Sequence, residues 1–376
     1  MNNQESVGYS YQKSRRNPGI DLLKTAAMVF VVMLHVLGHG GVLKNTTDLS
    51  LNYEVAWGLE SLAYCAVNVY VMITGFLYAD RTRKISSLIE LWMEVLFYSI
   101  LVPAVLFCAG FRIEKYHLFW CFFPVVGNQY WFFNQYCILF LFIPFMKKVC
   151  ENKQALKTIL LLGICAFSII PVLGRGEDLF KTNGGYSVFW FVFLFWTGAY
   201  IKLNPLPDRL RKHAGKVYLA SALLLLLSRN ILHIPILNRI GYKPDLFYSY
   251  TSPLVYICAV CLLSLFSEIT IQSSKAENAV KKMASLTFGV YLIHENRHVR
   301  SNLIAGRFAS FAAEPTAAML FHVLAAACVI FGICCLIDYL RSLIFRLIKT
   351  RKWAEIIGRS MERKWSSAMQ RLEEIF

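Results

Sequence analysis

Long apolar stretches separated by short polar segments recur along the chain of 376 residues. Many are about 16 to 24 residues long, close to the roughly 20 residues that a helix needs to cross a ~30 Å hydrocarbon core. Within them, as in 156–173 and 318–336, apolar residues follow one another without the alternation typical of transmembrane β-strands. The pattern therefore predicts an all-α fold, a polytopic integral membrane helical bundle.

We expect about ten transmembrane helices in this bundle, and two features could each change that count by one. The aromatic stretch 116–126 is too short to span, so we expect it to be re-entrant or interfacial. The ninth helix becomes polar after His294. The ten expected spans are 20–39, 55–79, 88–109, 129–146, 156–173, 186–201, 216–235, 250–267, 285–303 and 316–340.

Composition and charge refine this prediction. The chain is 57% hydrophobic and 16% charged, whereas roughly a quarter of the residues in a soluble domain are charged. Of the 39 Lys and Arg residues, 27 lie on the side where this topology places the N-terminus, and 11 lie in the opposite segments. Because cytoplasmic loops carry the excess of Lys and Arg, both termini are expected in the cytoplasm. The net charge of +16 is then mainly a signal of topology, and nucleic acid is not an expected partner. The basic segments are 1–19, 80–87, 147–157, 202–216, 272–282 and the stretch after 340; the sparse ones are 40–54, 110–128, 174–185, 229–249 and 295–315.

Three regions follow from this organisation. Residues 1–19 form a polar cytoplasmic tail without the pattern of a cleaved signal peptide, so the first helix must direct insertion. Residues 20–340 form the transmembrane domain, and 341–376 form a basic amphipathic tail expected to lie on anionic lipid. Most of the eleven cysteines fall inside apolar runs, where a thiol behaves as a small hydrophobe. We therefore expect neither disulfides nor a metal site.

The first helix carries the clearest chemical signal. Lys24 and His35 are eleven residues apart, which places both on one face of a helix, roughly 16 Å apart along its axis. Asp21 lies one turn before Lys24, and His39 lies one turn after His35. We therefore expect a polar stripe that runs from the cytoplasmic end of this helix past the middle of the bilayer.

Ionisable groups within membrane spans are rare and indicate function by default. For Asp21 and Lys24, an interfacial ion pair near the helix end is an equally good interpretation. His35 lies well inside the span, where a neutral imidazole needs a partner or a water-filled cavity. It could hydrogen-bond a neighbouring helix, but histidine is also the side chain best suited to act as a general base near neutral pH.

At these residues the sequence resembles the family 3 membrane acyltransferases, which O-acylate exported polysaccharides, lipopolysaccharide and related glycans. The pattern Asp21-x-x-Lys24-x10-His35 is similar to the signature of that family's first helix. Four further segments extend the resemblance along most of the chain, in the family's order. They are NVYVMITGFLYADR (68–81), YWFFNQYCILFLFIPF (130–145), FWFVFLFWTGAYI (189–201) and SLTFGVYLIH (285–294).

The resemblance implies a multi-pass enzyme of a cell membrane, the bacterial cytoplasmic membrane, that transfers an acyl group, expected to be acetyl, to a hydroxyl of an exported or lipid-linked glycan. It implies acyl-coenzyme A (acetyl-CoA) as co-substrate and no bound cofactor. Asp21, Lys24 and His35 are the catalytic residues that it implies. The polyanionic nucleotide of the donor should meet the basic cytoplasmic loops, while His35 removes the proton of the acceptor hydroxyl. A transient acyl-enzyme is equally compatible with these residues.

The sequence departs from the family pattern at three places, one of which is the arginine pair common after the second helix, present here only loosely as Arg81, Arg83 and Lys84. The family usually has Arg at the position of Lys24, so a guanidinium that can bind phosphate through two hydrogen bonds is replaced by a point charge. Many members also carry a Glu in the helix that begins near Trp131, where this chain has Asn134, Gln135 and Tyr136. We therefore assign no catalytic carboxylate in that helix.

Residues expected to bind substrate carry weaker signals. Thr74 precedes Gly75, and small residues also mark close helix packing. Tyr291 and His294 lie one turn apart and could line a cavity or anchor their helix at the interface. Glu94, with its neighbour Glu90, is expected to be structural and to neutralise Lys84 or Lys24. The substrate-binding candidates are Arg16, His39, Thr74, Trp131, Tyr291 and His294.

Two other classes of protein remain open. A transporter or flippase for a polysaccharide or a lipid-linked precursor also places charges inside a bundle, although it more often has an inverted repeat, which we do not find. A non-catalytic assembly factor for polysaccharide export would use the polar stripe only for packing. The expected partners are acyl-coenzyme A, a glycan or lipid-linked saccharide acceptor and the lipid bilayer, with a homo-oligomer as an open alternative.

Overall fold

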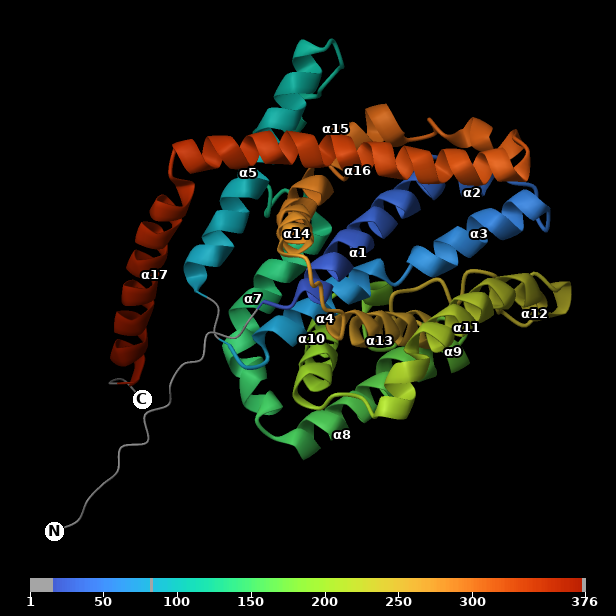
Figure 1. The fold of residues 1–376 in the computed structure, drawn as a ribbon, viewed down its shortest axis with the longest axis horizontal. Coiled ribbons are helices and arrows are strands. Elements are labelled where there is room, and N and C mark those ends of the chain that lie inside the picture. The colour runs from blue at the N-terminus through green and yellow to red at the C-terminus, as the bar shows by residue number, and fades with distance from the viewer. Residues whose placement is uncertain (1–15, 82–83, 374–376) are drawn as a thin grey trace.

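The computed structural model describes residues 16–81 and 84–373, and this part of the chain is built from helices and connecting loops, without a β-strand (Figure 1). The prediction of an all-α fold is confirmed. Six segments within the described residues are long and apolar enough to cross a membrane. They are Pro18–Asn45, Leu51–Tyr78, Ile85–Cys108, Lys153–Leu173, Asp208–Leu232 and Thr316–Leu347, and the shorter apolar helices are Val188–Leu203 and Pro253–Ser267.

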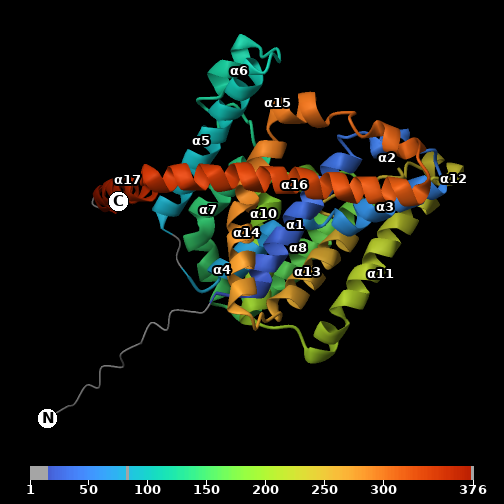
Figure 2. The same cartoon turned by 45° about the horizontal axis from the view of Figure 1, so that its top comes forward.

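The helix α1 (Pro18–Leu37) lies at the centre of the bundle. It contacts α3 (Leu51–Ala63), α4 (Ala66–Tyr78), α13 (Pro253–Ser267), α14 (Ser274–His294) and α16 (Thr316–Leu347), and Figure 2 shows it among these helices. The remaining elements are α2 (Val42–Asn45), α5 (Ile85–Cys108), α6 (Lys115–Trp120), α7 (Trp131–Cys150), α8 (Lys153–Ile164), η1 (Cys165–Ile169), α9 (Ile170–Leu173), η2 (Asn183–Gly185), α10 (Val188–Leu203), α11 (Asp208–Leu232), α12 (Pro235–Arg239), α15 (Arg297–Val299), η3 (Arg300–Ile304), η4 (Ala309–Ala313) and α17 (Thr350–Glu373).

Local sequence signals set both ends of α1. The side chain of Asn17 accepts a hydrogen bond from the backbone N–H of Ile20 at 3.2 Å, and Pro18 occupies the first helical position, where a missing N–H costs nothing. The helix ends at Leu37, before a glycine-rich turn in which Gly41 has a φ of 92°. Our expected span of 20–39 was therefore two residues too long at this end, and His39 lies in the turn.

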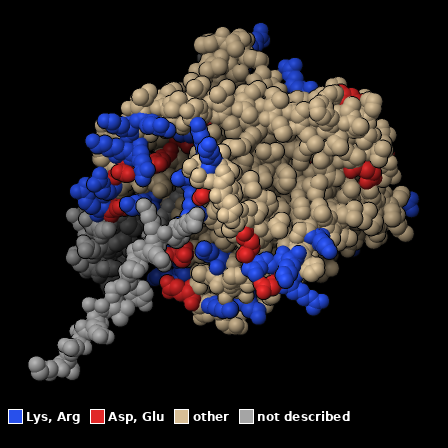
Figure 3. Space-filling model, viewed as in Figure 1, with Lys and Arg blue, Asp and Glu red and all other residues tan. Residues whose placement is uncertain are grey.

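The outer helices α7, α8, α11 and α16 present large apolar side chains on the surface of the molecule. Leu161, Leu223 and Ile333 are each more than half exposed. Charged side chains gather over α17 and the start of α5, and near the ends of α8 and α11, while most of the face between them is uncharged (Figure 3). An apolar belt of this kind is covered by lipid rather than by water, so the chain is a membrane protein.

The segments that connect the helices fall into two groups. Segments of one group form hydrogen bonds with other segments of the same group. In one group the N–H of Gly306 donates to the carbonyl oxygen of His39 at 3.0 Å, and the N–H of Tyr250 donates to that of Gly184 at 3.1 Å. In the other, Asn17 donates to the carbonyl oxygen of Ser267 at 2.8 Å. The groups correspond to the two sets of segments that differ in their content of Lys and Arg.

The structure corrects the ninth expected span. We expected a helix over 285–303, but α14 runs from Ser274 to His294 and is followed by short helices. The side chain of Asn296 caps the first of them by accepting from the N–H of His298 at 3.0 Å. The polar residues after His294 thus belong to a loop region. The aromatic stretch 116–126 begins within the six-residue α6 and continues in turns, as expected of a segment too short to span.

The carboxylate of Glu94 is part of a network that joins α5 to α16. We expected Lys84 or Lys24 to neutralise it, and Arg341 fills that role at 3.1 Å. Arg341 also donates two hydrogen bonds of 2.9 Å to Asp338, which accepts a third from Tyr98 at 2.8 Å. The structural interpretation of Glu94 is therefore supported. The helix α16 continues through residue 340 to Leu347, and α17 packs against α5.

Two glycines allow α4 and α10 to pack closely. A Cβ atom on Gly75 would collide with the backbone carbonyl of Phe195, and one on Gly198 would collide with the backbone carbonyl of Met72. Backbone atoms cannot rotate away as a flexible side chain can. The expectation that the segment around Thr74 and Gly75 serves close helix packing agrees with this geometry.

We expect Gly75→Ala to lower the melting temperature of the protein in detergent, because overpacking of this kind costs typically ~1–3 kcal/mol. The control is Gly332→Ala on α16, where a Cβ atom would enter open space. Thermal unfolding followed by intrinsic fluorescence compares both variants with the wild type. Equal melting temperatures for the two variants would show that the α4–α10 contact tolerates a wider separation.

Candidate active site

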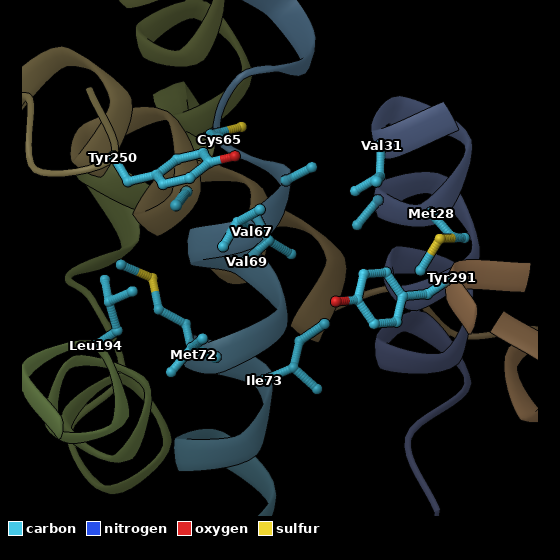
Figure 4. Close-up of a cluster of buried hydrophobic side chains, with 14 of the residues drawn as sticks. Met28, Val31, Cys65, Val67, Val69, Met72, Ile73, Leu194, Tyr250 and Tyr291 are labelled. Atoms are coloured by element: carbon cyan, nitrogen blue, oxygen red, sulfur yellow. The ribbon is translucent and has the colours of Figure 1, made fainter. Parts of the chain in front are cut away.

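The C-terminal half of α1 borders a cavity of about 390 Å³, within the range of roughly 300–1,000 Å³ that is typical of small-molecule sites. We call it the histidine cavity, because His35 and His39 are among its lining residues. Side chains from α1, α3, α4, α7 and α14 and from the loops line the rest. Figure 4 labels five of them, Met28, Val31, Val67, Tyr250 and Tyr291, on either side of the space between α1 and α4.

His35 lies beside a carboxylate that comes from a distant part of the sequence. Its Nδ1 atom is 3.4 Å from Oε2 of Glu295, the residue that follows α14. The other carboxylate oxygen of Glu295 accepts a hydrogen bond of 2.6 Å from Arg300. A base oriented by an acidic group is the arrangement that activates a hydroxyl in many transferases and hydrolases. A separation above 3.2 Å is longer than a strong hydrogen bond, and such contacts often tighten only when substrate binds.

Glu295 belongs to the loop after α14, outside the membrane-spanning helices. Burial raises the pKa of this carboxyl to about 7, although the charge of Arg300 and its hydrogen bond act in the opposite direction. The group therefore changes its charge near neutral pH. Only its ionised form can stabilise a proton that His35 has accepted.

Two further histidine rings pack against His35. The rings of His39 and His294 each have their centroid 4.9 Å from that of His35. The Nδ1 atom of His294 lies 2.5 Å from the carbonyl oxygen of Val290, so Nδ1 carries a proton and donates a hydrogen bond to that oxygen. Its buried Nε2 atom has no hydrogen-bond partner among the described residues. The site thus holds several imidazoles close to one ionisable carboxylate.

The same residues could hold a cation. The ligand atoms of His35, His39 and Glu295 lie within 4.8 Å of one another, the only such trio found in residues 16–81 and 84–373. Arg300 already occupies one oxygen of Glu295 and places a positive charge beside it, which opposes metal binding. Our expectation that the site uses no metal stays a prediction.

A second cavity of about 310 Å³ lies at the other end of the stripe on α1. We call it the basic cavity, because Arg16, Lys24, Arg81 and Lys202 line it. Asp21 also lines it and is bound by Arg16 through two contacts between the guanidinium and the carboxylate. Arg16 is therefore an ion-pair partner of Asp21.

Tyr70 of α4 separates the two cavities. Its side chain lines the histidine cavity, and its hydroxyl donates a hydrogen bond of 2.6 Å to the carbonyl oxygen of Lys24 in the basic cavity. Its ring also packs edge-on against Phe132, with ring centroids 6.4 Å apart. Tyr70 and the adjoining part of α1 thus form a partition between the two cavities along the stripe.

The structure distributes the expected site residues over both cavities. Thr74 lines neither of them. Its side chain is buried, and its hydroxyl donates a hydrogen bond of 3.3 Å to the carbonyl oxygen of Tyr70 in the same helix. His294 reaches the site through its contact with His35. The residues in the histidine cavity are His35, His39, Trp131 and Tyr291, and those in the basic cavity are Arg16, Asp21 and Lys24.

Sequence reasoning missed Glu295, Arg300, Glu60 and Tyr70, which also line the histidine cavity. A signal existed for Glu295, because it directly follows the segment SLTFGVYLIH. The resemblance places the family's carboxylate in the helix of residues 134–136 instead. No local pattern marks Glu60 or Tyr70, since their proximity to His35 depends on how α3 and α4 pack against α1.

A family model described as an acyltransferase domain matches residues 17–339, nearly the whole chain. Comparisons with curated proteins and with solved structures give no match. The matched region includes Lys24, His35 and Glu295 and almost all residues that line both cavities. The chain therefore belongs to the family 3 acyltransferases, and it is a membrane enzyme that transfers acyl groups other than aminoacyl groups.

Proposed function

We propose that this acyltransferase is an O-acetyltransferase that moves an acetyl group from acetyl-coenzyme A to a hydroxyl of an exported or lipid-linked glycan. One observation carries the proposal: a single face of α1 borders both a cavity lined by four basic side chains and a cavity in which an imidazole lies beside a carboxylate. The first fits a polyanionic donor, and the second fits the activation of a hydroxyl.

The donor binds with its nucleotide in the basic cavity. Lys24 and Lys202 supply positive charge for the phosphates of coenzyme A. Arg16 and Arg81 add to it, although each also pairs with an acidic residue of the cavity, Asp21 and Asp80. The thioester must then pass the partition at Tyr70 to reach His35. Beyond that partition, the histidine cavity is lined by apolar side chains such as Met28, which suit a short acyl chain.

His35 acts as the general base. It takes the proton of the acceptor hydroxyl as the oxygen attacks the carbonyl carbon of the thioester. The carbon–sulfur bond breaks, the proton passes from His35 to the departing thiolate, and an ester and free coenzyme A are formed. Glu295 orients the imidazole and stabilises its charged form. In the alternative with an acyl-enzyme, a side chain of the site carries the acetyl group between two such transfers.

The topology of this proposal has ten spans and both termini in the cytoplasm, so that the basic cavity faces the cytoplasm. The two contact groups of connecting segments support it, because they coincide with the segments rich and poor in Lys and Arg. In a background without reactive cysteines, a cysteine near Asn183 should react with a membrane-impermeant thiol reagent in intact cells. Cysteines in 202–216 and 272–282 should be protected. The reverse labelling would place the basic cavity on the wrong side for a cytoplasmic donor.

The function is tested by incubating the purified protein with radiolabelled acetyl-coenzyme A and glycan acceptors. Transfer of label to a glycan supports an O-acetyltransferase. A transporter, a flippase or a non-catalytic assembly factor would leave all label on coenzyme A. The family match already favours the enzyme over these alternatives.

Lys24 tests the role of the basic cavity. We expect Lys24→Arg to keep substantial activity, since charge and reach survive, and Lys24→Ala to weaken the binding of acetyl-coenzyme A by about tenfold, typical of one lost charged hydrogen bond. Isothermal titration calorimetry measures the affinity and a transfer assay measures the rate. An equal loss in both variants would indicate a packing constraint instead of attraction to phosphate.

A further inference from the structure

The wall formed by α3, the start of α7 and two loops carries features that the proposed reaction does not use. Trp131, Tyr64, Tyr186 and Tyr250 gather there, together with the carboxylate of Glu60. All of them line the same cavity as His35. Any molecule that occupies this part of the cavity therefore lies in the same space as the base.

Glu60 is an unusual residue for such a wall. Its side chain projects from α3 and is 8% exposed, and its buried Oε2 atom has no hydrogen-bond partner among the described residues. A buried carboxylate oxygen without a donor is costly, because it has lost water and gained nothing in return. Since this carboxylate lines the cavity, the missing donors are best supplied by a ligand.

The aromatic side chains form a layered surface beside Glu60. The rings of Trp131 and Tyr250 are nearly parallel, at 16° with centroids 6.2 Å apart. Tyr186 packs on both, with ring centroids 4.4 Å from Trp131 and 5.1 Å from Tyr250. Tyr64 extends the surface towards α3, 5.4 Å from Tyr250. Such a surface offers broad apolar contact to one face of a flat ligand.

The surroundings of Glu60 disfavour a cationic ligand. Arg229 of α11 places its guanidinium 3.5 Å from the centre of the ring of Trp57, which lies one turn before Glu60 on α3. This guanidinium also donates a hydrogen bond of 2.8 Å to the hydroxyl of Tyr53. A fixed positive charge on this side of the helix repels an ammonium group. A neutral ligand with several hydroxyls satisfies the carboxylate without this penalty.

We infer that this wall is the acceptor subsite, in which Glu60 accepts hydrogen bonds from ring hydroxyls of a neutral pyranose whose apolar face lies on the aromatic surface around Trp131. The inference rests on the proposed function and specifies its acceptor. A sugar held in this way shares the cavity with His35, so that a further hydroxyl can reach the base. Glu60 and Trp131 then determine which hydroxyl compounds are accepted, while His35 and Glu295 carry the chemistry.

The test uses the full-length protein in lipid nanodiscs with methyl glycosides of neutral hexoses as acceptors and saturating acetyl-coenzyme A. We expect Glu60→Gln and Trp131→Leu each to raise the KM for the glycoside by about tenfold, as befits the loss of a buried hydrogen-bond acceptor or of a large aromatic contact. The KM for acetyl-coenzyme A should not change. Glu54→Gln is the matched control, because Glu54 lies on the same helix but accepts from Asn230 at 2.9 Å outside the cavity.

A second readout separates this inference from the proposed function. Glycoside binding is measured without donor, by saturation-transfer NMR on the wild type and on both variants, and melting temperatures show that the variants are folded. Binding that both variants lose supports the subsite even if no acetyl group is transferred. Wild-type transfer with an unchanged glycoside KM in both variants overturns the subsite and leaves the proposed function standing. If the wild type neither binds nor acetylates a glycoside, both fail.

Discussion

Replacement of His35 by Gln should lower acetyl transfer by ~10²–10⁴-fold, the usual contribution of general base catalysis. Glutamine keeps much of the size and hydrogen-bonding capacity of histidine, but it cannot accept a proton at neutral pH. The variant should insert normally, melt near the wild-type temperature and bind acetyl-coenzyme A with unchanged affinity. Single-turnover transfer assays, calorimetry and thermal unfolding measure these three quantities.

His322 provides a matched control for this substitution. Its Nδ1 atom lies 2.6 Å from a carboxylate oxygen of Glu314, so that it repeats the histidine–glutamate contact away from both cavities. His322→Gln should leave transfer within about twofold of the wild type, as expected of a residue without a catalytic role. A purely structural His35 predicts a different result: His35→Gln would be nearly silent, and His35→Leu would lower yield and melting temperature together. An active, folded Gln variant would rule out the proposed mechanism.

Replacement of Glu295 by Gln should reduce kcat by about 10- to 100-fold with little change in the KM of either substrate. The neutral amide can still contact His35, but it no longer stabilises the protonated imidazole that forms during the reaction. The wild-type rate should rise as the pH increases through about 7, where this buried carboxyl loses its proton. In the Gln variant that part of the pH dependence should disappear.

The control for Glu295→Gln is Glu314→Gln, which removes the carboxylate beside His322. It should keep both the rate and the pH profile of the wild type. Glu295→Asp preserves the charge and should recover part of the activity lost in the Gln variant. If Glu295→Gln instead raises the KM of a substrate and leaves the pH profile unchanged, Glu295 holds the loop in place and does not assist His35.

The helical fold could be predicted because its cause is local. Apolar stretches long enough to cross a bilayer, such as 316–340, need no knowledge of tertiary contacts to be recognised as helices. The predicted ends of the helices were less accurate where one helix contains both a polar and an apolar segment. The polar first half of α14, from Ser274, does not look like a membrane span, yet it is continuous with the apolar half that ends at His294.

The sequence predicts only that part of the candidate site which a single helix determines. The spacing from Lys24 to His35 follows from helical periodicity, and the two residues do line cavities along the same helix. The carboxylate beside His35 could not be deduced in this way. Glu295 is far away in the sequence and approaches His35 only because α14 packs against α1, which no pattern within either segment reveals.

The partition at Tyr70 also has an electrical consequence. When water-filled cavities enter a membrane protein from opposite faces, the transmembrane voltage drops mainly across the thin region between them. In the proposed topology this region lies where Tyr70 donates to the carbonyl oxygen of Lys24. Each elementary charge that crosses it couples to the membrane potential by about 2.3 kcal/mol per 100 mV. In the proposed reaction His35 returns its proton to the thiolate, so a neutral thiol group leaves towards the cytoplasm and no net charge crosses this region. The rate of acetylation should therefore not depend on the membrane potential.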